Sequence, residues 1–291
     1  MTVKQKRVVL VDLSDTHAGS KYALMSPESR LYDEDERGNL IPYYPELTAS
    51  QKYLWDAYLS HIAAVKDLAG KDEIVLIHNG DLTHGIKYPQ GLVSSRLSDQ
   101  VAIAVENLSP WFAMPNLKAT RLSIGTGAHN VTEGATEILA TQVLKERFQK
   151  KNIEVLYHGI LNVNDCYVDY AHHGPYPGSR KWLEGNVAKL YLKSLMYSAV
   201  FSGLPIPDIV LRAHYHHPVV VKENMTYLSD FHESTLVISP SYSMLGDHGT
   251  QATQSTSVVS NGIYAIELFE HRVGQIIPFV SSIDIRTEEK L

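Results

Sequence analysis

Short hydrophobic runs alternate with helical periodicities along the first two thirds of the chain. Continuous apolar runs predict buried strands at residues 7–13, 74–77, 121–124, 168–171 and 209–213. Apolar positions that recur every three or four residues predict helices over residues 50–68, 97–108, 133–148 and 179–200. The remainder, from Val219 to Ile285, has the pattern of strands and turns only. This order of elements predicts a layered α/β fold in which part of the sheet structure is antiparallel.

The helical segments also indicate their buried faces and their ends. In the first helix, Thr48 or Ser50 can cap the N-terminus and Gly70 can end the helix. The predicted buried stripe of this helix comprises Leu54, Tyr58, Ile62, Val65 and Leu68. The third helix follows a possible cap at Thr132 and has a predicted stripe of Ile138, Val143, Leu144 and Phe148. In the last helix the same spacing predicts an inward stripe of Trp182, Leu190, Leu195 and Val200.

Residues 20–47 differ in composition from the rest of the chain, with three prolines and the acidic run 33–36. A charge run usually forms a solvated face, and the alternative is a loop inserted over an active site. No linker-like break in composition divides the chain. We therefore expect one domain over residues 1–291, with the insertion at about 20–47 and a strand-rich part at about 218–291.

The composition narrows the functional classes. Hydrophobic residues make up 44% of the 291 positions, which is enough for a large core. The formal net charge of −6 lacks the basic excess of a general nucleic-acid-binding protein, although a local patch stays open. No apolar run approaches the roughly 18 residues of a membrane helix, and the basic start precedes too short an apolar run for a signal peptide. With a single cysteine, Cys166, these features predict a soluble, cytoplasmic protein.

Histidine is the unusual component, with 14 residues against one cysteine. A transition-metal site in this chain must therefore be built from imidazole and carboxylate groups. Those groups suit Mn, Fe, Zn and similar divalent ions.

Candidate ligands of this kind follow the predicted strands, where open α/β sheets gather their ligands. Six side chains occupy such positions: Asp15, His17, Asp81, His172, His214 and His216. Alternate residues of an extended segment point to the same side, so Asp15 can face a site together with His17. Six ligands are more than one tetrahedral ion needs, which suggests two ions that share a carboxylate. Paired metals suit in-line displacement at phosphorus.

Neighbouring histidines have weaker claims as ligands. His172 and His173 are adjacent and point apart, and His172 is favoured because it directly follows the apolar run. His217 is out of phase with His214 and His216, which places it behind them. His84, in the loop after Asp81, is interpreted as a structural or supporting residue.

The order and the sequences of these segments resemble the motifs of the calcineurin-like metallophosphoesterase superfamily. Those motifs are Asp-x-His, Gly-Asp, Gly-Asn-His followed by an acidic residue, a single His after a strand, and Gly-His-x-His. The corresponding segments begin here at Asp15, Gly80, Gly127, His172 and Ala213. The Gly-Asp-Leu and Gly-Thr segments resemble those of phage- and prophage-type members of this superfamily more than those of its repair nucleases. The resemblance implies an α/β/β/α sandwich, with two mixed sheets flanked by helices.

The resemblance also implies a centre of two divalent ions. By position, the first ion takes Asp15, His17, Asp81 and His216. The second takes Asp81 as a bridge together with His172 and His214. His129 corresponds to the histidine that donates a proton to the leaving group or steadies the transition state.

Three positions depart from the family pattern. Ala128 stands where the family has an asparagine that binds the second metal, so Thr126, Asn130 or a water would have to substitute. Asn130 also replaces the acidic residue that usually orients the histidine at position 129. Ala213 stands where the last motif has glycine.

The leading hypothesis is a dinuclear metal-dependent phosphoesterase. It would be a phosphodiesterase that uses a metal-bound hydroxide on a phosphodiester or nucleotide-like substrate. Tyr22, Tyr32 and Tyr43 either stack on a ring of that substrate or are ordinary exposed tyrosines of a proline-containing loop. One alternative is a nuclease of the same chemistry, which needs a basic cluster formed by Arg180, Lys181, Lys189, Lys193 and Arg212. Another is a degenerate member that binds metal without turnover, as Ala128 suggests. Metal identity, natural substrate and oligomeric state stay open.

Overall fold

Two mixed β-sheets form the centre of the computed structural model, which describes residues 6–127, 129, 135–178, 180–246 and 257–289. The first sheet has the order β13 (Arg272–Asp284), β12 (Val258–Phe269), β1 (Val8–Leu13), β4 (Glu73–His78), β5 (Leu117–Ser123) and β6 (Asn152–Leu156). The second has the order β10 (Val219–Tyr227), β11 (Asp230–Ile238), β9 (Ile209–Arg212), β8 (Cys166–Ala171) and β7 (His158–Val163). Each sheet combines parallel and antiparallel pairs.

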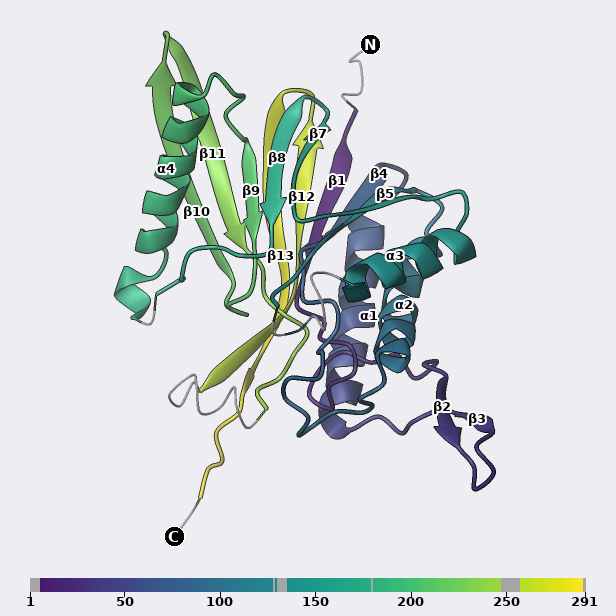
Figure 1. The fold of residues 1–291 in the computed structure, drawn as a ribbon. Helices are drawn as coiled ribbons and strands as arrows, with labels where there is room; N and C mark the ends of the chain where they lie inside the picture. Colours follow the sequence, from purple (N-terminus) through teal and green to yellow (C-terminus); the bar gives the residue numbers. More distant parts are fainter. Residues whose placement is uncertain (1–5, 128, 130–134, 179, 247–256, 290–291) are drawn as a thin grey trace.

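Helices cover the outer face of each sheet (Figure 1). The first sheet carries α1 (Ala49–Ala69), α2 (Leu97–Phe112) and α3 (Ala135–Arg147), and the second carries α4 (Asn186–Phe201). Alternation along β1 shows how the layers are held: Val9 and Val11 pack in the helix-side core, whereas Val8 and Leu10 pack between the sheets. The predicted α/β fold, with two mixed sheets flanked by helices, is confirmed.

The first helix forms as its sequence predicts. Thr48 is its N-cap and forms a reciprocal capping box with Gln51, and Gly70 ends it. Leu54 and Tyr58 lie on its buried face, against the first sheet and α2.

The predicted inward faces of the last two helices are wrong in part, since the predicted Leu144 and Leu195 do pack in the core. In α4 the buried residues are Ala188, Leu192 and Met196, while the predicted Trp182 is 78% exposed and lies in a short 3₁₀ turn, Lys181–Leu183. Gly185, with φ 84°, separates that turn from α4, so the phase of the apolar residues before it does not continue into the helix. Leu190 is likewise exposed. In α3 the buried residues include Ala140 and Leu144, while Ile138 and Val143 are exposed; Thr132 lies outside the described residues.

Strands β6 and β7 were not predicted, and each lies at an edge of its sheet. Edge strands are half exposed, so they alternate polar and apolar residues rather than forming an apolar run. In β6, for example, only Ile153 is fully buried.

Part of the proline- and tyrosine-containing stretch forms a hairpin of β2 (Leu31–Glu34) and β3 (Leu40–Tyr43), which projects from the lower right of Figure 1. Its acidic residues Asp33, Glu34 and Glu36 are exposed, as a solvated charge run would be. Among the described helices, none is both long and apolar enough to cross a membrane.

Candidate metal centre

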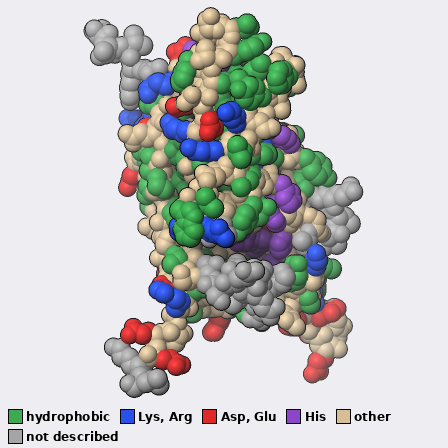
Figure 2. All heavy atoms as spheres, turned by 90° about the vertical axis from the view of Figure 1, so that its left-hand side faces the viewer, with side chains coloured by type: hydrophobic (Ala, Val, Ile, Leu, Met, Phe, Trp, Pro, Cys, Tyr) green, Lys and Arg blue, Asp and Glu red, His purple; other side chains and the backbone are tan. Residues whose placement is uncertain are grey.

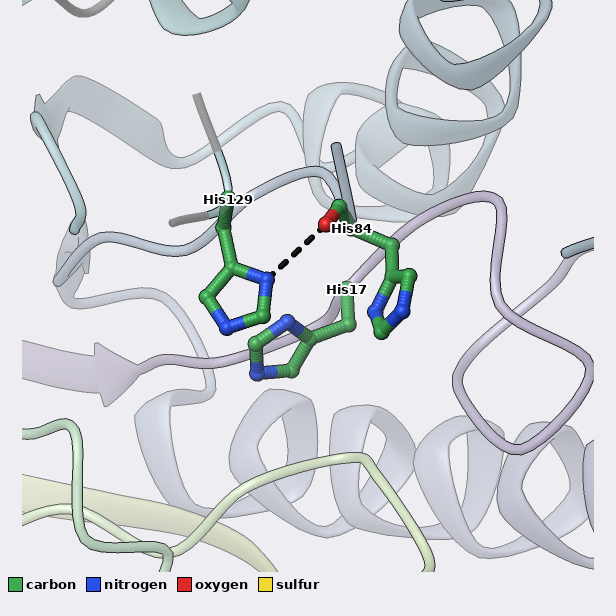
Figure 3. Close-up of side chains that lie close together, drawn as sticks. All are labelled: His17, His84 and His129. Carbon is green, nitrogen blue, oxygen red and sulfur yellow. Dashed lines mark hydrogen bonds between the residues drawn. The ribbon is translucent and has the colours of Figure 1, made fainter. Parts of the chain in front are cut away.

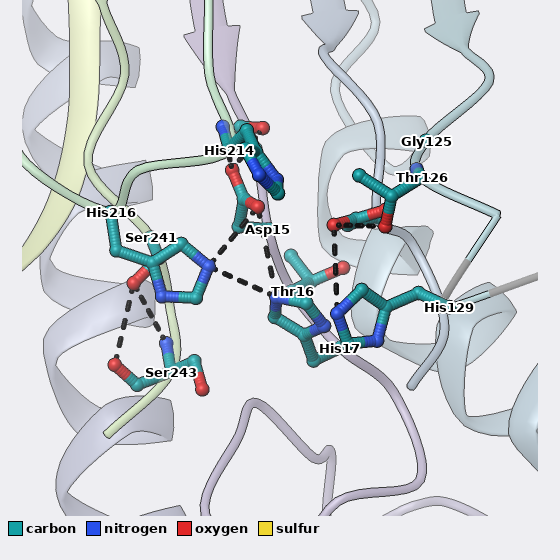
Figure 4. A network of polar contacts seen from close by, with 12 residues as sticks. Asp15, Thr16, His17, Gly125, Thr126, His129, His214, His216, Ser241 and Ser243 are labelled. Atoms are coloured by element: carbon teal, nitrogen blue, oxygen red, sulfur yellow. Dashed lines mark hydrogen bonds and ion pairs between the residues drawn. The ribbon is translucent and has the colours of Figure 1, made fainter. Parts of the chain in front are cut away.

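Loops that follow β1, β4, β5, β8 and β9 converge on one site (Figure 4). Backbone hydrogen bonds extend the parallel pairing of β1 and β4 beyond the strands, since Asp15 N donates to Gly80 O and His17 N donates to Asp81 O, both at 3.1 Å. Likewise, Ala213 N donates to His172 O at 2.8 Å, which ties the loops after β8 and β9 together. The candidate ligands are therefore carried by main-chain structure that is continuous with the sheets.

One group of candidate ligands comprises Asp15, His17 and His216, whose ligand atoms lie within 4.8 Å of one another. Nε2 of His216 lies 3.1 Å from Oδ1 of Asp15 and 3.1 Å from Nε2 of His17. The second Asp15 oxygen, Oδ2, accepts hydrogen bonds from the hydroxyl of Ser14 and the backbone amide of His214. One oxygen of Asp15 is thus fixed by the chain, and the other faces the imidazoles.

A second group comprises Asp81, His172 and His214, again within 4.8 Å of one another. Nε2 of His172 lies 3.1 Å from Oδ2 of Asp81, yet this buried nitrogen makes no well-aligned hydrogen bond to any described residue. Its other nitrogen, Nδ1, donates to the carbonyl of Asn79 at 2.6 Å. A carbonyl behind one nitrogen of an imidazole is the usual support of a metal-binding histidine, because it leaves the other nitrogen free for the ion.

Glycines provide the space for this second group. A Cβ at Gly80 would lie 2.4 Å from Nδ1 of His172, and a Cβ at Gly125 would lie 2.1 Å from Oδ1 of Asp81. The backbone and hydroxyl of Thr126 hold the same Asp81 oxygen, at 2.6 and 3.1 Å. Both donors fix the carboxylate while its Oδ2 faces His172.

The backbone at the candidate ligands is strained. Five of the six have φ in the left-handed region: Asp15 (50°), His17 (40°), Asp81 (47°), His214 (79°) and His216 (54°). The other described non-glycine residues with positive φ lie outside the site, at Asn164, Asp165, Leu228, Ser229 and His271. Asp and His enter this region more readily than most residues, but it still costs energy. Such conformations gather at functional sites, where the surrounding structure enforces them.

Charge and burial oppose one another in this centre. Burial would raise the pKa of Asp15, but the imidazoles of His216 and His172 lower it well below its usual range. Burial opposes a low pKa at Asp81 in the same way, and His172 lowers it. Burial acts against protonation of His172, yet the two carboxylates raise its pKa to about 9. Burial lowers the pKa of His17 to about 3, so this imidazole is neutral at physiological pH. Two ionised carboxylates among imidazoles fit divalent transition-metal ions.

His129, the predicted catalytic residue, lies beside both groups. Its Nε2 is 3.9 Å from Oδ2 of Asp81, and its ring lies 4.4 Å from that of His17, centroid to centroid. Its Nδ1 donates to the carbonyl of His84 at 2.9 Å (Figure 3). Because a carbonyl can only accept, this contact fixes the ring of His129 and leaves its Nε2 toward Asp81. Residues 128 and 130 lie outside the described residues. Of the groups expected to replace a ligand at Ala128, the described residues include Thr126, whose hydroxyl lies 3.1 Å from Oδ1 of Asp81.

The six predicted ligands and His129 all come together. The ring of His173 lies 4.7 Å from that of His214, centroid to centroid, but His173 is in neither ligand group. Nε2 of His217 lies 3.2 Å from Oε1 of Glu184. Sequence reasoning missed the carbonyls of Asn79 and His84, because a backbone oxygen leaves no mark in residue type. His84 itself joins His17 and His129 in a third cluster of imidazoles with ring nitrogens within 4.8 Å (Figure 3).

A cavity of about 580 Å³ opens onto these histidines. Its lining includes the imidazoles of His17, His129 and His216 together with Thr126. Histidine side chains reach the molecular surface together on the face shown in Figure 2. The cavity therefore opens three of the six candidate ligands, His17, His214 and His216, to solvent.

The basic cluster that nuclease activity would need lacks one of its members. Arg212 is 1% exposed, and its guanidinium pairs with Asp169 at 2.7 Å beneath Tyr191. It cannot contact a nucleic-acid backbone there.

Comparison with known proteins finds similarity among solved structures. No protein-family model matches the chain, and no curated protein matches it. Among solved structures, the metallophosphoesterase from Sphaerobacter thermophilus aligns over 96% of this chain and 89% of its own, with a TM-score of 0.34 and 13% sequence identity. The phage-type assignment stays a prediction.

Proposed function

We propose that this protein is a dinuclear metal-dependent phosphoesterase that hydrolyses phosphodiesters. The observation that carries the proposal is the pairing of two Asp/His groups on strained backbone, each with three ligand atoms within 4.8 Å. Asp15, His17 and His216 would hold one ion, and Asp81, His172 and His214 the other. We assign the shared position to Asp81, because it lies in the second group and also within 3.9 Å of His129 beside the first.

Divalent ions bound there would lower the pKa of a water molecule toward neutrality and neutralise charge on the phosphate oxygens. The chain's own contribution begins with orientation. Ser14 and Thr126 each hold a carboxylate from behind, and Asn79 fixes the tautomer of His172. These contacts prevent the ligands from turning away from the site, which is what outer contacts do for metal affinity.

His129 is placed to handle the proton of the departing group. The His84 carbonyl can only accept a hydrogen bond, so Nδ1 of His129 is the donor. The proton that His129 passes to a leaving oxygen is therefore carried on Nε2, the nitrogen that faces Asp81. General-acid help of this kind accelerates a reaction by about 10²- to 10⁴-fold.

Hydrolysis of bis(p-nitrophenyl) phosphate and p-nitrophenyl phosphate with added Mn²⁺ tests the proposal. We expect turnover of the diester above the monoester and two ions bound per chain. We expect a loss of at least about 100-fold in Asp81→Asn, because loss of an outer contact to a ligand alone costs about 10- to 100-fold. Asp165→Asn is the matched control, because Asp165 belongs to an exposed Asp/Glu/His group far from the cavity and has φ 60°, which asparagine tolerates.

Unchanged turnover in Asp81→Asn would contradict the proposal. Tight binding of metal with no hydrolysis of either substrate would instead support the binding-only alternative. Salt-dependent degradation of single-stranded DNA that exceeds diester turnover would support the nuclease alternative.

A further inference from the structure

The cavity at the metal centre has an apolar wall in addition to its histidines. Tyr22, Tyr88, Pro89, Met244 and Leu245 line the same 580 Å³ space as His17, His129 and His216. A phosphate held at the histidines would thus have its ester group within this cavity. Aromatic and aliphatic walls favour apolar or planar groups over charged chains.

Tyr22 is fixed before any ligand arrives. Its backbone oxygen accepts a hydrogen bond from Met244 N at 2.7 Å, and its backbone amide donates to the hydroxyl of Ser20 at 3.2 Å. Its ring lies so close to Gly91 and Gly246 that a Cβ there would come within 2.8 and 3.1 Å of ring atoms. A ring that is already ordered binds without the entropic cost of ordering a mobile side chain.

Positive charge is scarce in the cavity. Among the described residues that line it, Lys87 is the sole lysine or arginine. A chain of phosphates would need several cations along its path, whereas one phosphate at the metal centre needs none beyond the ions. The cavity therefore fits a compact ligand with a single phosphate.

We propose that the cavity binds a compact phosphoester with one aromatic or planar ester group, which stacks on Tyr22 while its phosphate lies at the histidines. This inference rests on the proposed function, since it takes the phosphate position from it. Tyr32 and Tyr43, the other tyrosines that the sequence offered for stacking, lie in the hairpin of β2 and β3 and do not line the cavity.

Binding of phenylphosphonate and methylphosphonate to the Mn²⁺-loaded protein tests the proposal by calorimetry without turnover. Base-on-aromatic stacking gives a guide to the size of the effect, and we expect phenylphosphonate to bind at least about tenfold more tightly. Tyr22→Leu should abolish most of this preference, and Tyr22→Phe, which retains the ring, should keep it. Tyr43→Leu is the control for loss of a tyrosine elsewhere. The affinity for methylphosphonate should stay the same in all three variants.

Two failures are distinguishable. Equal affinity for the two phosphonates in the unaltered protein, or a preference that survives Tyr22→Leu, would overturn the stacking wall alone. Absence of binding by both phosphonates would overturn the phosphate position, and with it both this inference and the proposed function.

Discussion

Replacing Gly80 with alanine should displace a candidate ligand without removing any ligand atom. Gly80 has φ 90°, and a Cβ built there would lie 2.4 Å from Nδ1 and 2.7 Å from Cβ of His172. Ordinary van der Waals contact begins near 3.4 Å. The His172 side chain must therefore retreat by about 1 Å, and its hydrogen bond to Asn79 O, now 2.6 Å, must lengthen or break.

Two separate costs follow from this change. Alanine at a left-handed φ costs about 1–2 kcal/mol of stability wherever it occurs. Displacing His172 also removes the support of its carbonyl partner, and loss of such support weakens metal binding by about 10- to 100-fold. The first cost belongs to the backbone and the second belongs to the site.

A matched substitution separates the two. Gly203 has φ 64°, and no atom lies within 4 Å of a Cβ built there, so Gly203→Ala carries the backbone cost without the clash. Urea denaturation should show a loss of about 1–2 kcal/mol in both variants, with the loss larger in Gly80→Ala. Titration with Mn²⁺ should show weaker binding only in Gly80→Ala. Mn²⁺ affinity and stoichiometry that match the unaltered protein in Gly80→Ala would refute the placement of His172 as a ligand.

Two further predictions concern charge. The pKa of His172 in the folded protein is raised from 6.5 to about 9, so the contribution of this group to stability is fully present below pH 6.5 and is lost as the pH rises to 9. The affinity for Mn²⁺ should increase over the same pH range, because the ion needs the neutral imidazole. A flat affinity from pH 6.5 to 9 would contradict the assignment of His172 as a metal ligand. Arg212→Met should lower the free energy of unfolding by up to about 3–5 kcal/mol, because Asp169 loses its buried partner and keeps only the exposed His158, whose Nε2 lies 2.9 Å from Oδ1. Adding Asp169→Asn should restore part of that loss in urea denaturation, and no restoration would contradict the ion-pair explanation.

Central strands were predictable because their environment is uniform. The run that became β1 is buried on both faces, so every one of its positions must be apolar or internally bonded. The first helix was predictable for a different reason, since the Thr48–Gln51 capping box and Gly70 are local signals that act without the rest of the fold. Where one environment or one local signal dominates, the residue types alone predict the secondary structure.

The predictions from periodicity are wrong or missing where tertiary packing or a chain break overrides the local apolar pattern. The stripe predicted through Trp182 assumed one continuous helix, but Gly185 interrupts it, and the phase of α4 follows its packing against Val219 and Val221. Edge strands such as β6 have a single buried face, and their few apolar residues do not stand out. Neither case can be resolved from periodicity alone.

In the candidate site, residue type predicted the side chains but not their supports. Asp15, Asp81 and His216 are recognisable together, because several carboxylate and imidazole groups each follow an apolar run, where open α/β sheets gather their ligands. The carbonyls of Asn79 and His84 are fixed by loop geometry, which the sequence reveals only through glycines such as Gly80 and Gly85. Prediction of the outer contacts would have needed the φ values of these loops.

The strained backbone bears on how stability and binding are coupled in this protein. Five candidate ligands with positive φ, at about 1 kcal/mol each, amount to a cost of the order of 5 kcal/mol, comparable with the whole stability of many proteins. The loops do not hold these angles alone, because Asp15 and His17 donate their backbone amides to the loop after β4. The sheets therefore enforce the backbone geometry of the candidate ligands. It follows that a core substitution that loosens β1 against β4 should weaken metal binding as well as stability, although it lies far from every ligand atom.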